Sequence, residues 1–133
     1  MDRVFLDANV LFSAAYRSDT PLRKLFSLQK AVLITSAYAL EEAQRNLSSP
    51  NQKTELVHLC KSVEVVSVVL PEEDVAILAE FPVSDRPILW AAIAVHASHL
   101  LSGDFKAFGR FYGDTIEGVK IVPPAEYLKK HSR

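Results

Sequence analysis

The chain has 133 residues and a formal net charge of −1, and 49% of its residues are hydrophobic. These values exclude a disordered chain and a broadly basic surface for nucleic acid, and they predict one folded domain over residues 1–133. The single cysteine, Cys60, excludes a disulfide framework and a multi-cysteine zinc site. Because no apolar run is long enough to span a membrane, we expect a cytoplasmic protein.

Strand-like and helix-like segments alternate along the first half of the chain. In order, we expect a strand at residues 4–6, helices at 8–16 and 21–28, a strand at 32–35, and helices at 36–47 and 54–61. Thr20 is placed to cap the second helix, with Pro21 at its first position. Residues 63–69 are β-branched almost throughout and predict the clearest strand of the chain.

The alternation continues through the second half. We expect a helix at 71–79, a helix at 85–99 capped by Ser84, strands at 100–102 and 119–122, and a terminal helix followed by a disordered basic tail at 129–133. Parallel strands need crossover connections, and helices between successive strands provide them. The pattern therefore predicts an α/β fold with a parallel sheet that is covered on both faces.

Acidic residues recur where the predicted strands end or the predicted helices begin. They are Asp7, Glu41, Glu42, Asp85 and Asp104. The carboxyl ends of parallel strands lie along one edge of a sheet, where open α/β folds bind ligands. Carboxylates gathered there repel one another unless cations neutralise them, and such hard oxygen ligands suit Mg²⁺ or Mn²⁺. The sequence therefore predicts a metal-dependent site for a phosphorylated substrate.

Each acid also has an ordinary structural explanation when it is considered alone. Asp7 suits a helix N-cap, Asp85 suits the first turn of a helix, and Asp104 suits a turn. On a helical wheel, Glu41 and Glu42 flank the apolar face equally, so periodicity does not choose between them. Their joint placement at one sheet edge, in segments that only folding brings together, favours a shared site over separate structural roles.

The other chemical groups give weaker signals. The four histidines, His58, His96, His99 and His131, have no metal-ligand spacing, and no nucleophilic triad or P-loop pattern is present. Basic residues near the acidic motifs are candidates for a local rim that binds a phosphate backbone; they are Arg17, Arg45, Arg86, Lys106 and Arg110.

Four short motifs together resemble those of the PIN domain family, which includes VapC-type toxins and related non-toxin proteins. They are Phe-Leu-Asp-Ala-Asn at residues 5–9, Ser36 followed by Glu42, Asp-Arg-Pro-Ile-Leu-Trp-Ala-Ala at 85–92, and Leu-Ser-Gly-Asp at 101–104. Their order and spacing cover the chain from residue 4 to about residue 128. The resemblance implies a three-layer α/β/α sandwich with a central, mostly parallel sheet of four to five strands.

The resemblance also implies a function, an Mg²⁺- or Mn²⁺-dependent endoribonuclease. The family's catalytic and metal-binding positions map to Asp7, Glu42, Asp85 and Asp104, with Asn9 and Ser102 as supporting residues. Glu42 is chosen over Glu41 only through its distance from Ser36. The implied partners are an RNA substrate and a possible antitoxin protein. The resemblance further implies a homodimer, for which Leu22, Leu25 and Phe26 are candidate surface residues.

Three other functions share parts of this pattern. A phosphatase of the haloacid dehalogenase type needs a second aspartate at the position of Asn9, and a receiver domain needs an acceptor aspartate where Leu70 and Pro71 follow the third strand. The third alternative is a catalytically weak or inactive PIN scaffold that binds RNA or a protein partner. The presence of all four acids favours an active enzyme.

Overall fold

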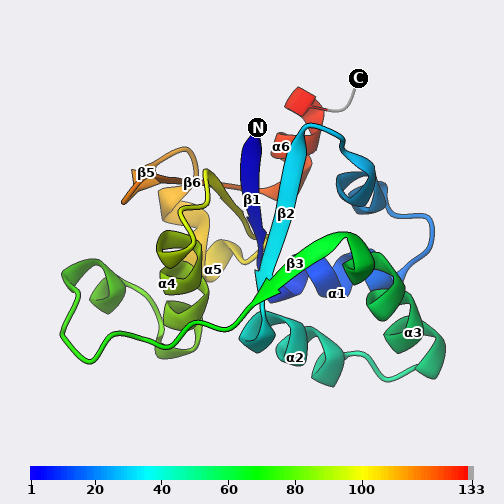
Figure 1. The fold of residues 1–133 in the computed structure, drawn as a ribbon, viewed down its shortest axis with the longest axis horizontal. Coiled ribbons are helices and arrows are strands. Elements are labelled where there is room, and N and C mark those ends of the chain that lie inside the picture. The colour runs from blue at the N-terminus through cyan, green and yellow to red at the C-terminus, as the bar shows by residue number, and fades with distance from the viewer. Residues whose placement is uncertain (132–133) are drawn as a thin grey trace.

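The structure, a computed structural model, describes residues 1–131 and places a central sheet between layers of helices (Figure 1). Over these residues the strands are β1 (Asp2–Leu6), β2 (Ala31–Ser36), β3 (Val63–Val66), β4 (His99–Leu101), β5 (Thr115–Ile116) and β6 (Val119–Val122). The α-helices are α1 (Ala8–Tyr16), α2 (Ala37–Asn46), α3 (Pro50–Leu59), α4 (Arg86–Ala94), α5 (Phe105–Phe108) and α6 (Pro124–His131). Short 3₁₀ helices cover Pro21–Ser27, Cys60–Ser62, Ala76–Glu80, Val83–Asp85 and Gly109–Phe111.

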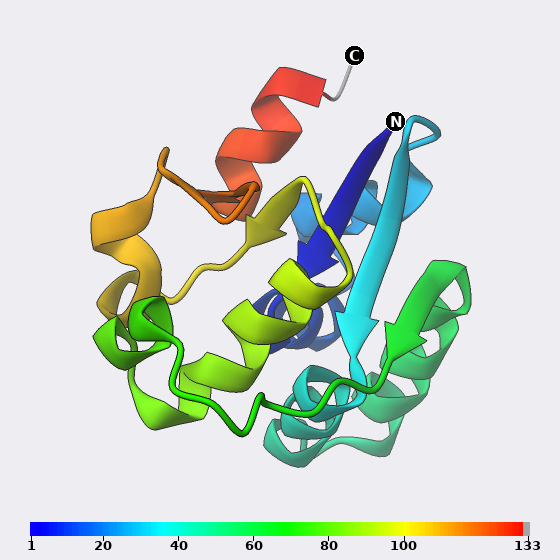
Figure 2. The same ribbon diagram turned by 60° about the vertical axis from the view of Figure 1, so that its left-hand side comes forward.

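The order of the strands reverses between β1 and β4. Across the sheet the order is β3-β2-β1-β4-β6-β5, and β1 to β4 and β6 run parallel while β5 runs antiparallel to β6. The chain moves outwards from β1 to β3 and then crosses to the other side of β1 to form β4 (Figure 2). This reversal makes the carboxyl ends of β1 and β4 the topological switch point, where open α/β sheets bind ligands.

The expected α/β sandwich with a mostly parallel sheet is confirmed, although residues 1–131 form six strands rather than four or five. Neighbouring side chains of a strand point to opposite faces, so the strands build two apolar cores. Phe5 and Leu100 contribute to the core under α4, whereas Val4, Leu6 and Leu101 contribute to the core under α1, α3 and α6. All five side chains are fully buried. The apolar runs of β1 and β4 therefore fix the sheet between both helical layers.

The strand expected at residues 63–69 is shorter in the structure, where β3 ends at Val66. Val63 to Val66 pair with Leu33 to Ser36 of β2, and α2 begins directly after Ser36. Residues 67–69 consequently have no β2 residue opposite them. Their β-branched composition favours an extended chain but does not provide a pairing partner.

Two predicted helices also differ from the structure. Residues 71–79 form no α-helix; Ala76–Glu80 is a 3₁₀ turn, and Ile77 and Leu78 pack on the core under α4. α4 ends at Ala94 rather than near residue 99, since His96 adopts a left-handed conformation with φ 55°. A single short helix gains few internal hydrogen bonds, so the packing of its side chains decides its form.

The predictions for the ends of other elements had mixed outcomes. The Thr20 cap is confirmed, because its hydroxyl accepts from the N–H of Leu22, although the helix that follows is 3₁₀. The expected disorder of the basic tail is wrong for residues 129–131, which form the last turn of α6, and residues 132–133 lie outside the described residues.

Within residues 1–131, no helix has both the length and the apolarity needed to cross a membrane.

Candidate functional site

Backbone hydrogen bonds hold the ends of β1, β2 and β4 together at the switch point. The N–H of Asp7, which follows the last residue of β1, donates to the carbonyl of Leu101 at 3.0 Å. The buried hydroxyl of Thr35 in β2 donates to the carbonyl of Leu6 at 2.8 Å. The strand ends are thus fixed relative to one another, and so are the points from which the next side chains leave the sheet.

The carboxylate of Asp7 lies at this point and makes three hydrogen bonds. Oδ1 accepts from the N–H of Ala8 at 2.6 Å, while Oδ2 accepts from the Ser102 hydroxyl at 2.6 Å and from the Asn9 amide at 3.0 Å. Asp7 is only 3% exposed. It therefore does cap α1, as the ordinary explanation expects. A carboxylate has about four acceptor positions, so a further one is available to a cation or a water molecule.

Ser102 and Asn9 link the two strand ends around Asp7. The fully buried hydroxyl of Ser102 also accepts from the backbone N–H of Asp104 at 3.1 Å. The Asn9 Oδ1 accepts from the N–H of Gly103 at 2.8 Å, and its Nδ2 donates to the Ser102 Oγ at 3.3 Å. Both predicted supporting residues thus contact Asp7 directly, and the amide of Asn9 also forms a hydrogen bond to the turn after β4.

The predicted acids influence one another electrostatically. Burial raises the pKa of Asp7 to about 6, against the hydrogen bonds from Ser102 and Ala8, and the charges of Asp85 and Glu42 add to the rise. Burial also raises the pKa of Asp85, followed by the charges of Asp104 and Glu42. Although the four acids come from separate segments, Asp7 therefore lies in the fields of Asp85 and Glu42, and Asp85 in those of Asp104 and Glu42.

The structure distinguishes the two neighbouring glutamates of α2. Glu42 is half-buried and acts on both Asp7 and Asp85, as described above. Glu41 is exposed and borders a shallow groove together with Gln44, Arg45 and Lys53. Glu42, and not Glu41, is therefore oriented towards the other acids.

The capping explanation applies to Asp104 but not to Asp85. Asp104 Oδ1 accepts from the N–H of Ala107 at 3.2 Å and caps α5. Asp85 occupies the N-cap position of α4, yet within residues 1–131 its carboxylate makes no capping hydrogen bond. Ser84, which we expected to cap this helix, instead lies exposed in the preceding 3₁₀ turn. Asp85 thus lies at the start of α4, where the helix dipole favours a negative charge, but its carboxylate does not cap the helix.

The donor set has the chemistry that a hard divalent cation prefers, four carboxylates without histidine or cysteine. In the described part of the chain, no three His, Cys, Asp or Glu side chains are grouped closely enough to hold a metal ion as they stand. Mg²⁺ commonly binds one or two carboxylates and keeps several waters, so it does not need a complete protein cage. The residues fit Mg²⁺ or Mn²⁺ because a cation would offset both the burial that chiefly raises the pKa of Asp7 and the smaller effect of the charges of Asp85 and Glu42.

Two tyrosines that the sequence did not indicate flank the acids. The Tyr38 hydroxyl on α2 donates to the carbonyl of Ser84 at 2.8 Å, and the Tyr112 hydroxyl donates to the carbonyl of Ser102 at 2.8 Å. Burial raises the pKa of both phenols. The charges of Glu42 and Asp85 add to the rise at Tyr38, and those of Asp104 and Asp7 add to it at Tyr112. Tyr38 lies two residues after Ser36, but no sequence pattern marks Tyr112.

Three of the five residues of the predicted basic rim interact with other groups of the protein. Arg17 pairs with Asp19, Arg86 donates to the carbonyl of Phe81, and Arg110 pairs with Glu80 while lying over the ring of Phe111. Arg45 and Lys106 form no ion pair with any residue from 1 to 131. Lys106 lies two residues after Asp104, whereas Arg45 borders the groove beside Glu41 and its charge acts on Tyr38. Of the five predicted rim residues, these two remain available to meet a phosphate.

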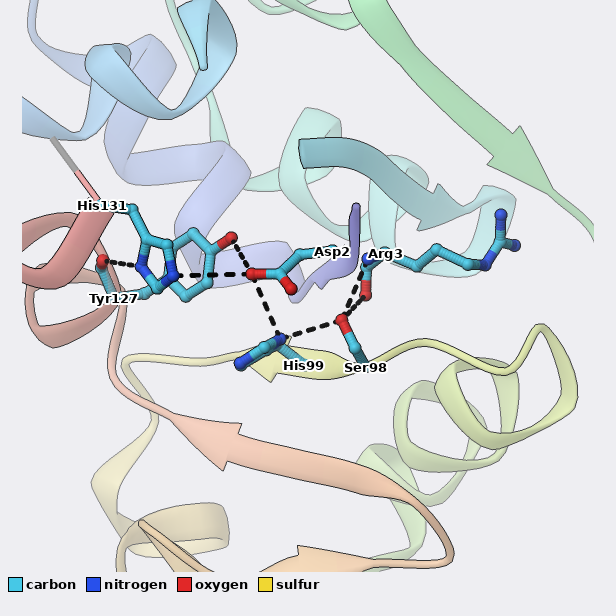
Figure 3. A network of polar contacts seen from close by, with 6 residues as sticks. All are labelled: Asp2, Arg3, Ser98, His99, Tyr127 and His131. Atoms are coloured by element: carbon cyan, nitrogen blue, oxygen red, sulfur yellow. Dashed lines mark hydrogen bonds and ion pairs between the residues drawn. The ribbon is translucent and has the colours of Figure 1, made fainter. Parts of the chain in front are cut away.

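A second polar cluster lies at the opposite edge of the sheet, where β1 and β4 begin (Figure 3). The Tyr127 hydroxyl donates to Asp2 Oδ2 at 2.8 Å, and His131 Nε2 and His99 Nδ1 lie 3.5 and 3.9 Å from the same oxygen. Ser98 Oγ contacts His99 Nδ1 at 2.9 Å. Burial lowers the pKa of His99, and Asp2 opposes this shift. The cluster anchors α6 to the first strand, a proximity that histidine spacing did not reveal.

Comparisons with known proteins identify the fold. The structure is similar to a chain in the crystal structure of VapBC2 from Rickettsia felis bound to a DNA fragment from their promoter, with a TM-score of 0.66. The match covers 91% of this chain and 98% of that chain at 16% sequence identity. No protein-family model matches the sequence, and no curated protein matches it. At this identity the likeness shows the fold alone, and the PIN-like fold that the motifs predicted is confirmed.

Proposed function

We propose that this chain, whose fold is PIN-like, is an Mg²⁺- or Mn²⁺-dependent endoribonuclease that hydrolyses RNA phosphodiester bonds in the cytoplasm. The observation that carries the proposal is the buried carboxylate of Asp7 at the switch point, in the fields of Asp85 and Glu42. Asp85 supports it further, since its carboxylate makes no capping hydrogen bond among the described residues and lies in the fields of Asp104 and Glu42.

Each side chain has a role in the proposed reaction. Asp7 and Asp104 are the principal metal ligands, while Asp85 and Glu42 complete the site directly or through water. When bound, the cation supplies a water of lowered pKa and stabilises the charge that develops on the phosphate oxygens. The Ser102 hydrogen bond lowers the pKa of Asp7 and so favours the ionised form that binds a cation.

The substrate is proposed to approach past Arg45 and Lys106. A local pair of cations is compatible with the net charge of −1, because backbone binding needs positive charge at the site and not over the whole surface. Their ammonium and guanidinium groups would position the phosphates on either side of the scissile bond without reading the base sequence.

The two glutamates of α2 provide a matched test of this function. Purified protein is expected to cut single-stranded RNA with Mg²⁺ or Mn²⁺ and to stop in EDTA. Glu42→Gln should lower kcat/KM about 10- to 100-fold, as expected for a group that supports a metal site through water. Glu41→Gln removes the same charge from an exposed position of the same helix and should stay within about twofold of the wild type.

Equal rates for the two glutamine variants would contradict the assignment of Glu42. RNA binding without cleavage under any divalent metal would instead favour the alternative of an inactive PIN scaffold. Rates should be measured at several concentrations of metal, because a weakened cation site is partly rescued by excess cation whereas a misfolded site is not.

The likeness to a chain of VapBC2 also supports a more specific proposal, that the enzyme is the toxin of a toxin–antitoxin pair and binds an antitoxin protein. The fold is compatible with this role but is shared by proteins of many functions. A small open reading frame directly upstream of the gene, whose product copurifies with this chain and inhibits RNA cleavage, is the observation that would establish the pairing.

A homodimer is proposed as well, but through another surface than the one the sequence suggested. Leu25 is buried and Leu22 and Phe26 are half-buried in the core under α6, so these three residues are part of the fold. β3 forms one edge of the sheet, and its Val65 is 44% exposed. Such an edge can pair with another strand, and a lysine placed there opposes pairing.

We therefore expect sedimentation equilibrium at tens of micromolar to show a dimer, and Val65→Lys to shift it to a monomer. The exposed Val57 of α3 provides the control, because Val57→Lys adds the same charge away from the sheet edge. A wild-type monomer at this concentration would contradict the dimer, and dissociation by Val57→Lys alone would place the interface on α3.

A further inference from the structure

Phe105 is an exposed aromatic residue directly beside a predicted metal ligand. It follows Asp104, begins α5, and is 74% exposed. Over residues 1–131 the exposed aromatic side chains are Tyr16, Tyr38 and Phe105. Two of these three are neighbours of the acids, one beside Asp104 and the other beside Glu42. Single exposed apolar residues are common, so it is the position of these rings that needs an explanation.

The ring of Phe105 faces solvent and lies against Gly109. A Cβ atom on Gly109 would lie 2.6 Å from the nearest atom of this ring, so the ring occupies the space that the missing side chain leaves. On another side the ring centroid lies 6.3 Å from that of Tyr112, whose hydroxyl is bonded to the carbonyl of Ser102. Phe105 is thus oriented by its own helix and by a tyrosine that contacts the acidic site.

Tyr38 occupies the other side of the site. Its ring is 38% exposed, and its hydroxyl is bonded to the carbonyl of Ser84, next to Asp85. Glu42 lies one helical turn further along α2, on the same face as Tyr38. The hydrogen bond between α2 and the segment before α4 keeps the ring beside the acids.

We propose that Phe105 and Tyr38 are stacking platforms for unpaired bases of single-stranded RNA on the two sides of the scissile phosphate. This inference rests on the proposed ribonuclease function and adds the side chains that bind the bases of the substrate. Aromatic rings stack with any base and favour single strands, since the bases of a duplex are already stacked on their neighbours. The arrangement therefore selects single-stranded over double-stranded RNA, with little preference for base sequence at the stacked positions.

The test uses a single-stranded oligoribonucleotide that contains 2-aminopurine, whose fluorescence is quenched when the base stacks. In EDTA, where no cleavage occurs, wild-type protein should quench the fluorescence as it binds. Phe105→Ala and Phe105→Leu should each weaken binding about tenfold and lose most of the quenching, whereas Phe105→Trp should retain both. The leucine variant keeps an apolar side chain but removes the flat aromatic face. Val57→Ala, an exposed change on α3, should match the wild type.

Gly109→Ala tests the orientation of the ring without removing it. The backbone at Gly109 is helical, with φ −55° and ψ −39°, so alanine fits the local conformation. The added methyl group must displace the ring of Phe105. We expect binding weaker than wild type by a few fold and reduced quenching, while circular dichroism shows an unchanged fold.

The outcomes separate this inference from the proposed function. If wild-type protein cuts RNA and Phe105→Leu and Tyr38→Leu bind and quench as wild type does, the function stands and the stacking inference is wrong. If wild-type protein neither binds nor cuts the oligonucleotide, both are wrong. If Phe105→Ala leaves RNA binding unchanged but abolishes self-association in sedimentation, the ring belongs to a protein interface, which also overturns the inference.

Discussion

Asp7→Asn is expected to lower RNA cleavage about a thousandfold, the size of effect seen when a group that stabilises the transition state is removed. The substitution keeps the shape of the side chain but removes the charge that would attract the cation. Asp104→Asn should have a similar effect, and because the ligands act as a unit the double variant should be little worse than either single one. Cleavage is measured under single-turnover conditions with saturating metal.

The same variant is expected to alter the dependence of stability on pH. In the fold the pKa of Asp7 rises from 3.8 to about 6, so the folded protein binds a proton more tightly than the unfolded chain does. Tighter proton binding raises the free energy of unfolding. The increase is fully present below pH 3.8 and is lost as the pH rises through about 6, a change of about 3 kcal/mol. Asp7→Asn should therefore be less stable than the wild type at pH 4 and at least as stable at pH 7.5.

Urea denaturation in EDTA at the two pH values measures this difference. The expected gain at pH 7.5 is reduced because asparagine has one acceptor oxygen instead of two, and one hydrogen bond of about 1–2 kcal/mol is lost. If Asp7→Asn unfolds the domain at pH 7.5, Asp7 acts chiefly as the cap of α1. If nuclease activity survives the substitution, the metal-site proposal is wrong.

Ser102→Ala is expected to reduce both stability and activity, although Ser102 carries no charge. Its buried hydroxyl donates to Asp7 and accepts from the N–H of Asp104. Its removal should cost about 2–3 kcal/mol, since a hydrogen bond to a carboxylate and a buried acceptor are lost together. The pKa of Asp7 should rise further, because the Ser102 hydrogen bond lowers it. The acid limb of the pH–rate profile should therefore move to higher pH.

Ser98→Ala is the matched control for this effect. Ser98 precedes the opposite end of the same strand, and its hydroxyl accepts from the N–H of Arg3 and contacts the Arg3 carbonyl and His99. Its loss should lower stability without moving the pH–rate profile. If both variants lose stability but neither shifts the profile, Ser102 is a structural residue that does not act through Asp7.

The sequence predicted the elements whose apolar pattern is set by burial, and missed those that depend on a neighbour. β1 and β4 follow from short continuous apolar runs, and α1 follows from helical apolar spacing. α5 and β5 are too short to show a period. β5 exists because Glu117 and Gly118, both at positive φ, turn the chain back onto β6 as a two-residue hairpin. Gly118 was a usable signal for that turn.

For the candidate site, sequence reasoning identified which residues to consider but not how they are held. The motifs named Asp7, Asp85 and Asp104 because each stands at a strand end or helix start. Periodicity left Glu41 and Glu42 equal, and the choice depends on the direction in which α2 leaves β2, which is a tertiary property. Tyr112 was missed for the same reason, because its contact with Ser102 depends on how α5 and the 3₁₀ helix after it return the chain to the end of β4.

The central position of β1 has a consequence for the synthesis of this protein. Asp7 lies near the start of the chain, yet the hydroxyl that supports it belongs to Ser102, 95 residues later. A nascent chain that has released β1, β2 and β3 from the ribosome still lacks β4 and Asp104, so it cannot assemble the four carboxylates. If the protein is the nuclease proposed above, the nascent chain stays inactive until β4 and Asp104 have been synthesised and released. The strand order thus delays the activity until the sheet closes around β1.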